Sequence, residues 1–438
     1  MRVSGGTCAC LVLFIGMLLT TMSAAGQEAL PFRRAIELAL AHSSEMAVSQ
    51  ADEARAYRTY LEARNSYIPQ AAIGSDLGYA YGFPLSLEGS APTLFNVTAQ
   101  SSVFSPAQRE FVRAAKAEWG VSKTQSTDQR AQVIADTALT YIELNRWEER
   151  LPILRSEMNV VTDVEYAVGE RVKAGIDNPV EQTKAKLLEA QTRVHIAEAE
   201  GAVDILQTRL SQMTGLPASA IKTVRESIPV LAENPPQGDL GSRAAQVSPA
   251  VEAAQQSAIA KQLRAKGEHK GLYPTADFAA QYGLINTSLT NFEKFFVPGS
   301  FQPHNVTFGL VLRLPFLNAS QRSRAQAADA DALRARKEAE EAKNKASLDA
   351  LKLQHNVQQL LAARDVAQLR YELAQSQLDA AHARLQAQTG PQRELQNASI
   401  EAAERTLDRV NTDFALQRAQ VELLRATGEL QQWALSAP

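Results

Sequence analysis

The sequence predicts a mainly α-helical protein with a β-barrel portion, in which a long α-helical coiled-coil barrel joins four strands per chain. These strands would contribute to a trimeric, twelve-stranded transmembrane barrel. Three observations lead to this fold class: two very long helical patterns, two pairs of stretches that alternate apolar and polar residues, and the repetition of this whole order within 438 residues. Such a repetition indicates one structural plan used twice.

Residues 1–25 have the pattern of a secretory signal peptide. Arg2 supplies the positive start, Leu11 to Leu19 the apolar core, and residues 23–26 the small side chains at a cleavage site. An uncleaved anchor is disfavoured because the apolar run is shorter than the roughly 20 residues that a spanning helix needs. Cys8 and Cys10 would leave with the signal, so we expect no disulfide, thiolate site or lipidated cysteine in the mature chain.

Composition narrows the class of partner. The chain is 45% apolar and 21% charged, which is typical of a folded protein, and its net charge is −3. Nucleic-acid binding requires clustered lysine and arginine, so no nucleic-acid partner is expected.

The chain divides into two repeats of one order: a helix, a strand pair, a long helix and a return helix. The first repeat covers 26–215 with its strand pair at 68–104, and the second covers 248–428 with its strand pair at 273–317. A proline-rich connector, 216–247, joins them, and a tail, 429–438, ends the chain. Proline at 69 and at 274 precedes each first strand.

The long helices are predicted from Pro106 to about Lys173 and from Ala319 to about Gln388. At 1.5 Å per residue each would extend on the order of 100 Å, longer than a single globular core. Gly175 and Gly390 would end them and allow a return helix. Heptad spacing of apolar residues predicts coiled-coil packing. The predicted seams are Ala325, Ala328, Ala332, Ala335, Ala339, Ala342 and Ala346; Val180, Leu187, Ala190, Val194 and Ala197; and Leu407, Val410, Phe414, Val421 and Leu424.

Each strand is predicted to span about 10 to 13 residues and to have one apolar and one polar face, as transmembrane barrel strands do. The lipid-facing positions would be Ile73, Leu77, Tyr79, Phe95, Val97, Phe278, Tyr282, Phe308 and Leu310. The lumen-facing positions would be Asp76, Gln100, Gln281 and Arg313. A half-buried sheet in a soluble sandwich would alternate in the same way, but its strands need not reach membrane-spanning length.

Four strands cannot close a barrel, and an open edge in hydrocarbon would leave backbone groups unpaired at several kcal/mol each. Closure must therefore come from other copies of the chain. Two copies could form a narrow eight-stranded barrel, whereas three would give twelve strands and a wider lumen. Three copies are favoured.

At this point the sequence resembles the outer-membrane efflux protein family, the TolC-like channel-tunnels, over nearly all of the mature chain. The resemblance depends on order and duplication rather than on any single motif. The matching segments are Phe104-Ser105-Pro106, Pro315-Phe316-Leu317, Val180-Glu181-Gln182-Thr183, Leu395-Gln396-Asn397-Ala398, Thr214-Gly215 and Thr427-Gly428.

The resemblance implies a homotrimer in the outer membrane that extends into the periplasm, with the connector and chain ends in a belt around its middle. It implies a passive channel of a tripartite efflux pump or type I secretion system. Its partners would be outer-membrane lipid, a periplasmic adaptor and an inner-membrane pump. The transported substrate is not indicated.

The helix turns would form the periplasmic tip, where the resemblance implies an aperture. Candidate aperture residues are Glu181, Arg393, Glu394, Gln396 and Ser399. Best-known members carry an aspartate ring at positions matching Gln396 and Ser399, so a strong cation site is not expected here. For any one of the charged residues among them, a solvated charge at a helix end is favoured over a gate.

No catalytic chemistry is predicted. The histidines His42, His195, His269, His304, His355 and His382 lack metal-site spacing, and no Walker loop, dinucleotide fingerprint or nucleophile elbow occurs. No cofactor or enzymatic activity is expected. Two alternatives are a secreted structural coiled-coil protein, which should show one unbroken periodicity, and a periplasmic adaptor, which should show a single hairpin with lipoyl-like strands.

Overall fold

The computed structural model describes residues 29–76, 78–82, 92–231, 238–387, 389 and 392–436. These residues form two compact units. The first combines residues 29–38 with 140–228, and the second combines 39–139 with 229–436. The predicted signal peptide lies outside the described residues. Helix α3 (Pro106–Lys173) contributes to both units.

Helices in one half of the chain have counterparts of matching length in the other. Helices α3 and α7 (Ala319–Gln386) each contain 68 residues, and the return helices α4 (Pro179–Thr214) and α8 (Gln392–Ala426) contain 36 and 35. The short helices α2 (Ser44–Asn65) and α6 (Pro249–Lys270) both contain 22. The long helices lie where the sequence predicts them.

Helix ends follow local sequence signals. Asn178 caps α4 by accepting a hydrogen bond from the Val180 amide, and Pro179 occupies the first turn, where its missing N–H costs nothing. Gly215 follows α4 at φ +75°, a conformation that glycine adopts without steric cost. Gly175 takes φ +71° in the turn after α3, as predicted for a helix break. Gly390 lies outside the described residues.

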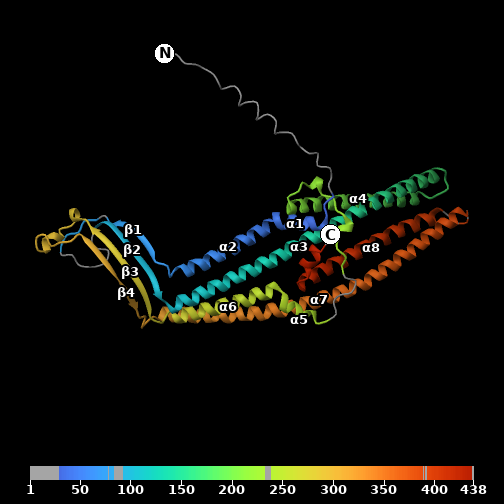
Figure 1. Cartoon of the computed structure of the whole chain (residues 1–438). Helices are drawn as coiled ribbons and strands as arrows, with labels where there is room; N and C mark the ends of the chain where they lie inside the picture. Colours follow the sequence, from blue (N-terminus) through green and yellow to red (C-terminus); the bar gives the residue numbers. More distant parts are fainter. Residues whose placement is uncertain are drawn as a thin grey trace, which may run out of the picture. The chain divides into compact units, whose positions relative to one another are not determined.

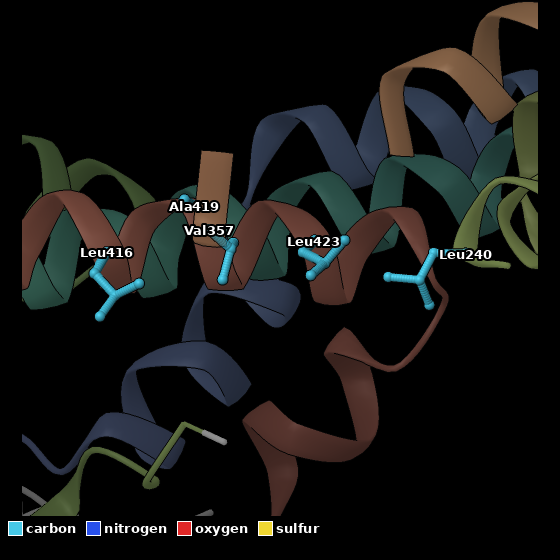
Figure 2. Close-up of a cluster of buried hydrophobic side chains, with 5 residues drawn as sticks. All are labelled: Leu240, Val357, Leu416, Ala419 and Leu423. Atoms are coloured by element: carbon cyan, nitrogen blue, oxygen red, sulfur yellow. The ribbon is translucent and has the colours of Figure 1, made fainter. Parts of the chain in front are cut away.

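Helices α7 and α8 form a long hairpin within the second unit (Figure 1). Its buried cluster joins three helices: Leu240 from α5 (Leu240–Val247), Val357 from α7, and Leu416, Ala419 and Leu423 from α8 (Figure 2). The predicted alanine seam of α7 is largely confirmed. Ala325, Ala335 and Ala339 are buried, and the other four alanines of the seam are half-buried. The α8 seam is buried or half-buried throughout. The alanines of the α7 seam allow the helix axes to approach closely.

The same unit holds one antiparallel sheet in the order β1-β2-β3-β4, formed by β1 (Gln70–Asp76), β2 (Thr93–Phe104), β3 (Thr275–Ile285) and β4 (His304–Arg313) (Figure 1). Strand β2 from the first half pairs with β3 from the second half, so the two halves share one sheet. Strands β1 and β4 are its edges.

The first unit is organised around Tyr141 of α3, which is fully buried. Its hydroxyl donates a hydrogen bond to the Leu30 carbonyl (2.6 Å) and accepts one from the Val224 amide (2.7 Å). The Phe32 ring meets the Tyr141 ring edge to face at 5.3 Å between centroids. Leu30 also forms a parallel bridge with Thr223, so the start of the described chain and the connector are tied to the same helix.

We expect Tyr141→Phe to lower the free energy of unfolding of this unit by about 1–3 kcal/mol, because it leaves the buried Leu30 carbonyl and the part-buried Val224 amide without their shared partner. The measurement is the thermal unfolding midpoint followed by circular dichroism. Tyr166→Phe is the matched control, since the Tyr166 side chain on the same helix is 70% exposed. Equal midpoints for the two variants would contradict the role of the hydroxyl.

Three details differ from the sequence-based expectation. The first helical segment is broken at Ser43, whose extended backbone and hydroxyl cap α2, so that α1 (Phe32–His42) is a separate helix. The connector is not wholly irregular, because its last eight residues form α5. The predicted tail contains a helix, α9 (Leu430–Leu435).

The predicted seam on α4 does not pack within the single chain. Val180, Leu187 and Val194 are each more than half exposed. The buried stripe of α4 is instead Ala185, Thr192, Ala199 and Leu206, which are spaced strictly by seven. Larger side chains misled the prediction, because the closely packed side of this helix carries small residues. Helix α4 therefore has a second, exposed apolar stripe with heptad spacing.

Candidate functional site

The sheet has one apolar face. The register places Ile73, Val97, Tyr282 and Val306 in one row across all four strands, and directly paired residues point to the same face. The neighbouring rows add Phe95, Phe278, Phe308 and Leu310. Much of this face is uncovered in the single chain: Ile73 is 73% exposed and Phe308 75%. Isolated soluble proteins rarely expose so continuous an apolar surface.

The opposite face of the sheet is polar and carries every Asp, Glu, Lys and Arg of the four strands. Arg313 forms an ion pair with Asp277 at 2.8 Å between Nη1 and Oδ2, and the Asn96 amide donates to Asp76 at 2.6 Å. Gln100 and Gln281 lie on this face in the register. The four residues predicted to face the lumen thus share the polar face, and the lumen itself stays a prediction.

The predicted apolar face is present with two exceptions. Strand β1 contains seven residues rather than the expected ten or more, because its register shifts between Gly74 and Asp76 and glycines follow at positions 78 and 82. Tyr79 therefore lies beyond the strand and is 72% exposed. Leu77 lies outside the described residues.

The turn between α3 and α4 is a compact, charged structure in the first unit. Arg171 binds Asp177 through two hydrogen bonds of 2.7 and 3.1 Å. This pairing raises the pKa of the Arg171 guanidinium. Glu181, predicted at the aperture, accepts from Lys184 at 3.0 Å. Its charge is thus balanced within its own helix.

The turn between α7 and α8 belongs to the second unit. Glu394 forms an ion pair with Arg384 across the turn, and the Thr389 amide donates to the Arg384 carbonyl at 2.9 Å. Gln396 and Ser399 lie in the first turns of α8 and are half-buried, and Arg393 is exposed. Because the two turns lie in different units, each stands as a separate candidate for the aperture.

Within the described residues, no three His, Cys, Asp or Glu side chains gather in an arrangement that could hold a metal ion. None of the helices in the described ranges is both long and apolar enough to cross a membrane.

No family model and no curated protein matches the sequence. Solved structures do match. A membrane protein from Pseudomonas aeruginosa has a TM-score of 0.76 at 16% identity, covering 92% of this chain and 95% of that chain. The open state of the Neisseria gonorrhoeae MtrE outer membrane channel has a TM-score of 0.74 at 15% identity, covering 94% of each chain.

The outer membrane protein VceC from Vibrio cholerae has a TM-score of 0.69 at 17% identity, covering 91% of this chain and 96% of that chain. These likenesses extend over nearly the full length of both partners, strands and helices included. The chain therefore has the fold of the outer-membrane channels.

Proposed function

We propose that this protein is one subunit of a homotrimeric outer-membrane channel that extends into the periplasm and carries substrates out of the cell. It would serve a tripartite efflux pump or a type I secretion system as a passive conduit. The observation that carries the proposal is the four-stranded sheet, whose apolar face is continuous and exposed while its charges lie on the other face.

Strand dimensions support a membrane location. The 11 residues of β3 extend about 35 Å at roughly 3.3 Å per residue, and a tilt of about 45° would reduce this to about 25 Å of membrane thickness. Aromatic side chains lie at both ends of the sheet, Tyr79 and Phe296 near one end and Phe104 and Phe316 near the other. Aromatic residues at both interfaces are typical of transmembrane barrels.

The strand order supports assembly from copies. Strands β1 and β4 are the two sheet edges, and edges buried in lipid must find a hydrogen-bonding partner. Pairing of β4 in one copy with β1 in the next would close the sheet, and three copies would give twelve strands. The exposed stripe of Val180, Leu187 and Val194 on α4 has the heptad spacing of a seam for another helix.

The proposed partners are a periplasmic adaptor and an inner-membrane pump. The similar structures are channels rather than enzymes, and a channel of this kind needs an energised component elsewhere. The cargo would be selected mainly by that component, which is why the channel's own residues do not indicate it.

Fractionation followed by planar-bilayer recording tests the proposal. The mature protein should be found in the outer-membrane fraction as an oligomer that dissociates on heating, and the purified oligomer should conduct ions. Recovery as a soluble monomer without conductance would refute the proposed function. The structural coiled-coil alternative predicts an oligomer but no conductance.

Cation block is expected to be weak. The carboxylates near the turns are paired with cations, Glu181 with Lys184 and Glu394 with Arg384, and the neutral Gln396 and Ser399 lie beside the second turn. Bilayer recordings with trivalent cations on the periplasmic side should therefore show little block. Gln396→Asp should strengthen the block. Gln368→Asp is the control, because Gln368 lies within α7, away from the turn that joins α7 to α8. Tight block of the unaltered channel would contradict this account of the tip.

A further inference from the structure

One aromatic residue stands at the helix-side end of every strand. Tyr67 precedes β1, Phe104 ends β2, Tyr273 precedes β3 and Phe316 follows β4. Three of the four are more than half exposed, and Phe316 is 92% exposed. We call these four residues the junction ring. In membrane barrels, aromatic side chains at strand ends form girdles at the membrane interfaces, and tyrosine places its hydroxyl at the level of the lipid headgroups.

A pocket of about 430 Å³ opens at this junction between the segment that precedes β1, the end of β2, the start of α3 and the end of α6. Two members of the junction ring, Tyr67 and Phe104, line it together with Arg109 and Lys270. Phe104 pairs with Ala276, whose neighbour across the sheet on β4 is Leu312 of the apolar face. The pocket therefore lies at the rim of the apolar face, and its volume is in the range of small-ligand sites.

One cationic side chain that lines the pocket, Arg109, could bind an anion. Within the described residues, the Arg109 guanidinium makes no ion pair and its side chain is exposed. Lys270, by contrast, is bound to Glu110 at 2.7 Å, and Glu110 is also contacted by Arg113 at 3.2 Å. Since Glu110 is balanced by two cations, no net negative charge opposes an anion beside Arg109.

The surrounding junction is basic, although the chain as a whole has a charge of −3. The junction segments 62–66, 105–113, 266–277 and 313–324 contain eight Lys and Arg residues against four Asp and Glu residues. The cations are Arg64, Arg109, Arg113, Lys266, Lys270, Arg313, Arg322 and Arg324. A net charge of +4 in this band favours an anionic surface over a zwitterionic one.

We propose that this pocket binds the headgroup of an anionic glycerophospholipid from the periplasmic leaflet, an inference that rests on the proposed membrane function. The Arg109 guanidinium would bind the phosphate, which its planar, forked donors fit. The Tyr67 and Phe104 rings would lie against the glycerol and the upper acyl chain. The chains would then continue along the apolar face of the sheet. Neutral lipids lack the net charge that the basic band selects.

The test counts lipids retained by the trimer. The full-length mature trimer is reconstituted in nanodiscs of phosphatidylethanolamine and phosphatidylglycerol, and native mass spectrometry measures the two lipids that stay bound. The unaltered protein should retain phosphatidylglycerol in preference. Arg109→Gln should reduce this preference about fivefold, the effect of one cation near an anionic surface. Phe104→Ala should weaken retention of both lipids.

Arg370→Gln is the matched control, because Arg370 is also exposed and unpaired within the described residues but lies about 75 Å along α7 from its start at 1.5 Å per residue. It should retain phosphatidylglycerol as the unaltered protein does. Equal retention by Arg109→Gln and the unaltered protein would overturn the lipid site. So would full displacement of the lipid by millimolar inorganic phosphate, which would assign the pocket to the free anion.

Bilayer conductance is measured on the same preparations. If Arg109→Gln conducts normally but retains lipid as before, the lipid inference fails and the proposed function stands. If the unaltered protein forms no conducting oligomer, the proposed function fails and the inference fails with it.

Discussion

Arginine in place of Val97 or Phe308 is expected to destabilise the membrane-inserted oligomer by about 2–4 kcal/mol per chain. Both residues lie in apolar rows of the sheet, Val97 opposite Ile73 and Tyr282, and Phe308 opposite Ala280. A guanidinium on this face near the membrane midplane would have to leave water for hydrocarbon. The yield of heat-dissociable oligomer from outer membranes measures the effect.

Gln100→Arg is the matched control because Gln100 lies on β2 three residues from Val97 and on the polar face. Oligomer yield should stay close to that of the unaltered protein. Equal yields for Val97→Arg and Gln100→Arg would show that the two faces do not meet different environments, and the assignment of the apolar face to lipid would then be wrong.

The second large effect is expected at Glu110. Its side chain is 4% exposed and accepts hydrogen bonds from Lys270 and Arg113. Glu110→Gln removes two charge-assisted hydrogen bonds: the one from Lys270 joins α6 to the start of α3, and the one from Arg113 lies within α3. We expect a loss of about 1.5–3 kcal/mol in the free energy of unfolding at neutral pH. Glu404→Gln on α8 is the control, because Glu404 is exposed. A Glu110 variant as stable as this control would contradict the assignment.

The same carboxylate gives a pH dependence. The hydrogen bond from Lys270 lowers the pKa of Glu110 below its ordinary 4.5, outweighing the opposing effect of burial. A lowered folded-state pKa means that the stabilisation is fully present above 4.5 and is lost as the pH falls through the folded-state pKa. The unaltered protein should therefore have the higher thermal midpoint at pH 7, and its difference from Glu110→Gln should shrink as the pH falls through the folded-state pKa of Glu110. A constant difference at all pH values would contradict this linkage.

Much of the fold could be predicted because its local and global signals agree. Helix lengths followed from uninterrupted helical patterns that begin at Pro106 and Ala319, and the ends followed from Asn178, Gly175 and Gly215. Strand faces could be predicted because a period of two fixes the face of every residue once one is placed. Asp76, Gln100, Gln281 and Arg313 accordingly lie together on the polar face.

The errors have a different cause: at these positions the residue pattern is compatible with more than one local structure. On α4 the larger Val and Leu residues suggested a seam, but close packing selected Ala185, Thr192 and Ala199. At Ser43 a local capping hydrogen bond ended one helix and began the next, although the helical pattern continues through it. In β1 the register shift after Gly74 shortened a strand whose alternation continues to Tyr81.

The junction pocket and the junction ring were not predicted, because the pocket residues come from three separate segments and the ring from four, all with ordinary local patterns. Tyr67, Phe104, Tyr273 and Phe316 are each a single aromatic residue beside a proline or serine. A sequence signal was nonetheless available: the same residue class recurs at the same end of all four strands. The sequence does not show that Arg109 makes no ion pair, because this depends on the neighbouring Glu110 binding Lys270 and Arg113 in the folded chain.

Cysteine cross-linking of the two sheet edges tests most directly whether copies of the chain complete one another's sheet. Cysteine at Ala72 on β1, combined in turn with cysteine at Asn305, Thr307, Gly309 or Val311 on β4, should give a covalent trimer for at least one combination. The mature protein is predicted to have no competing cysteine. Cysteine at Thr98 with cysteine at Thr307 should give no cross-link, because β3 separates these strands by about 10 Å. Only monomers across the whole series, with the protein recovered from buffer lacking detergent, would contradict the account.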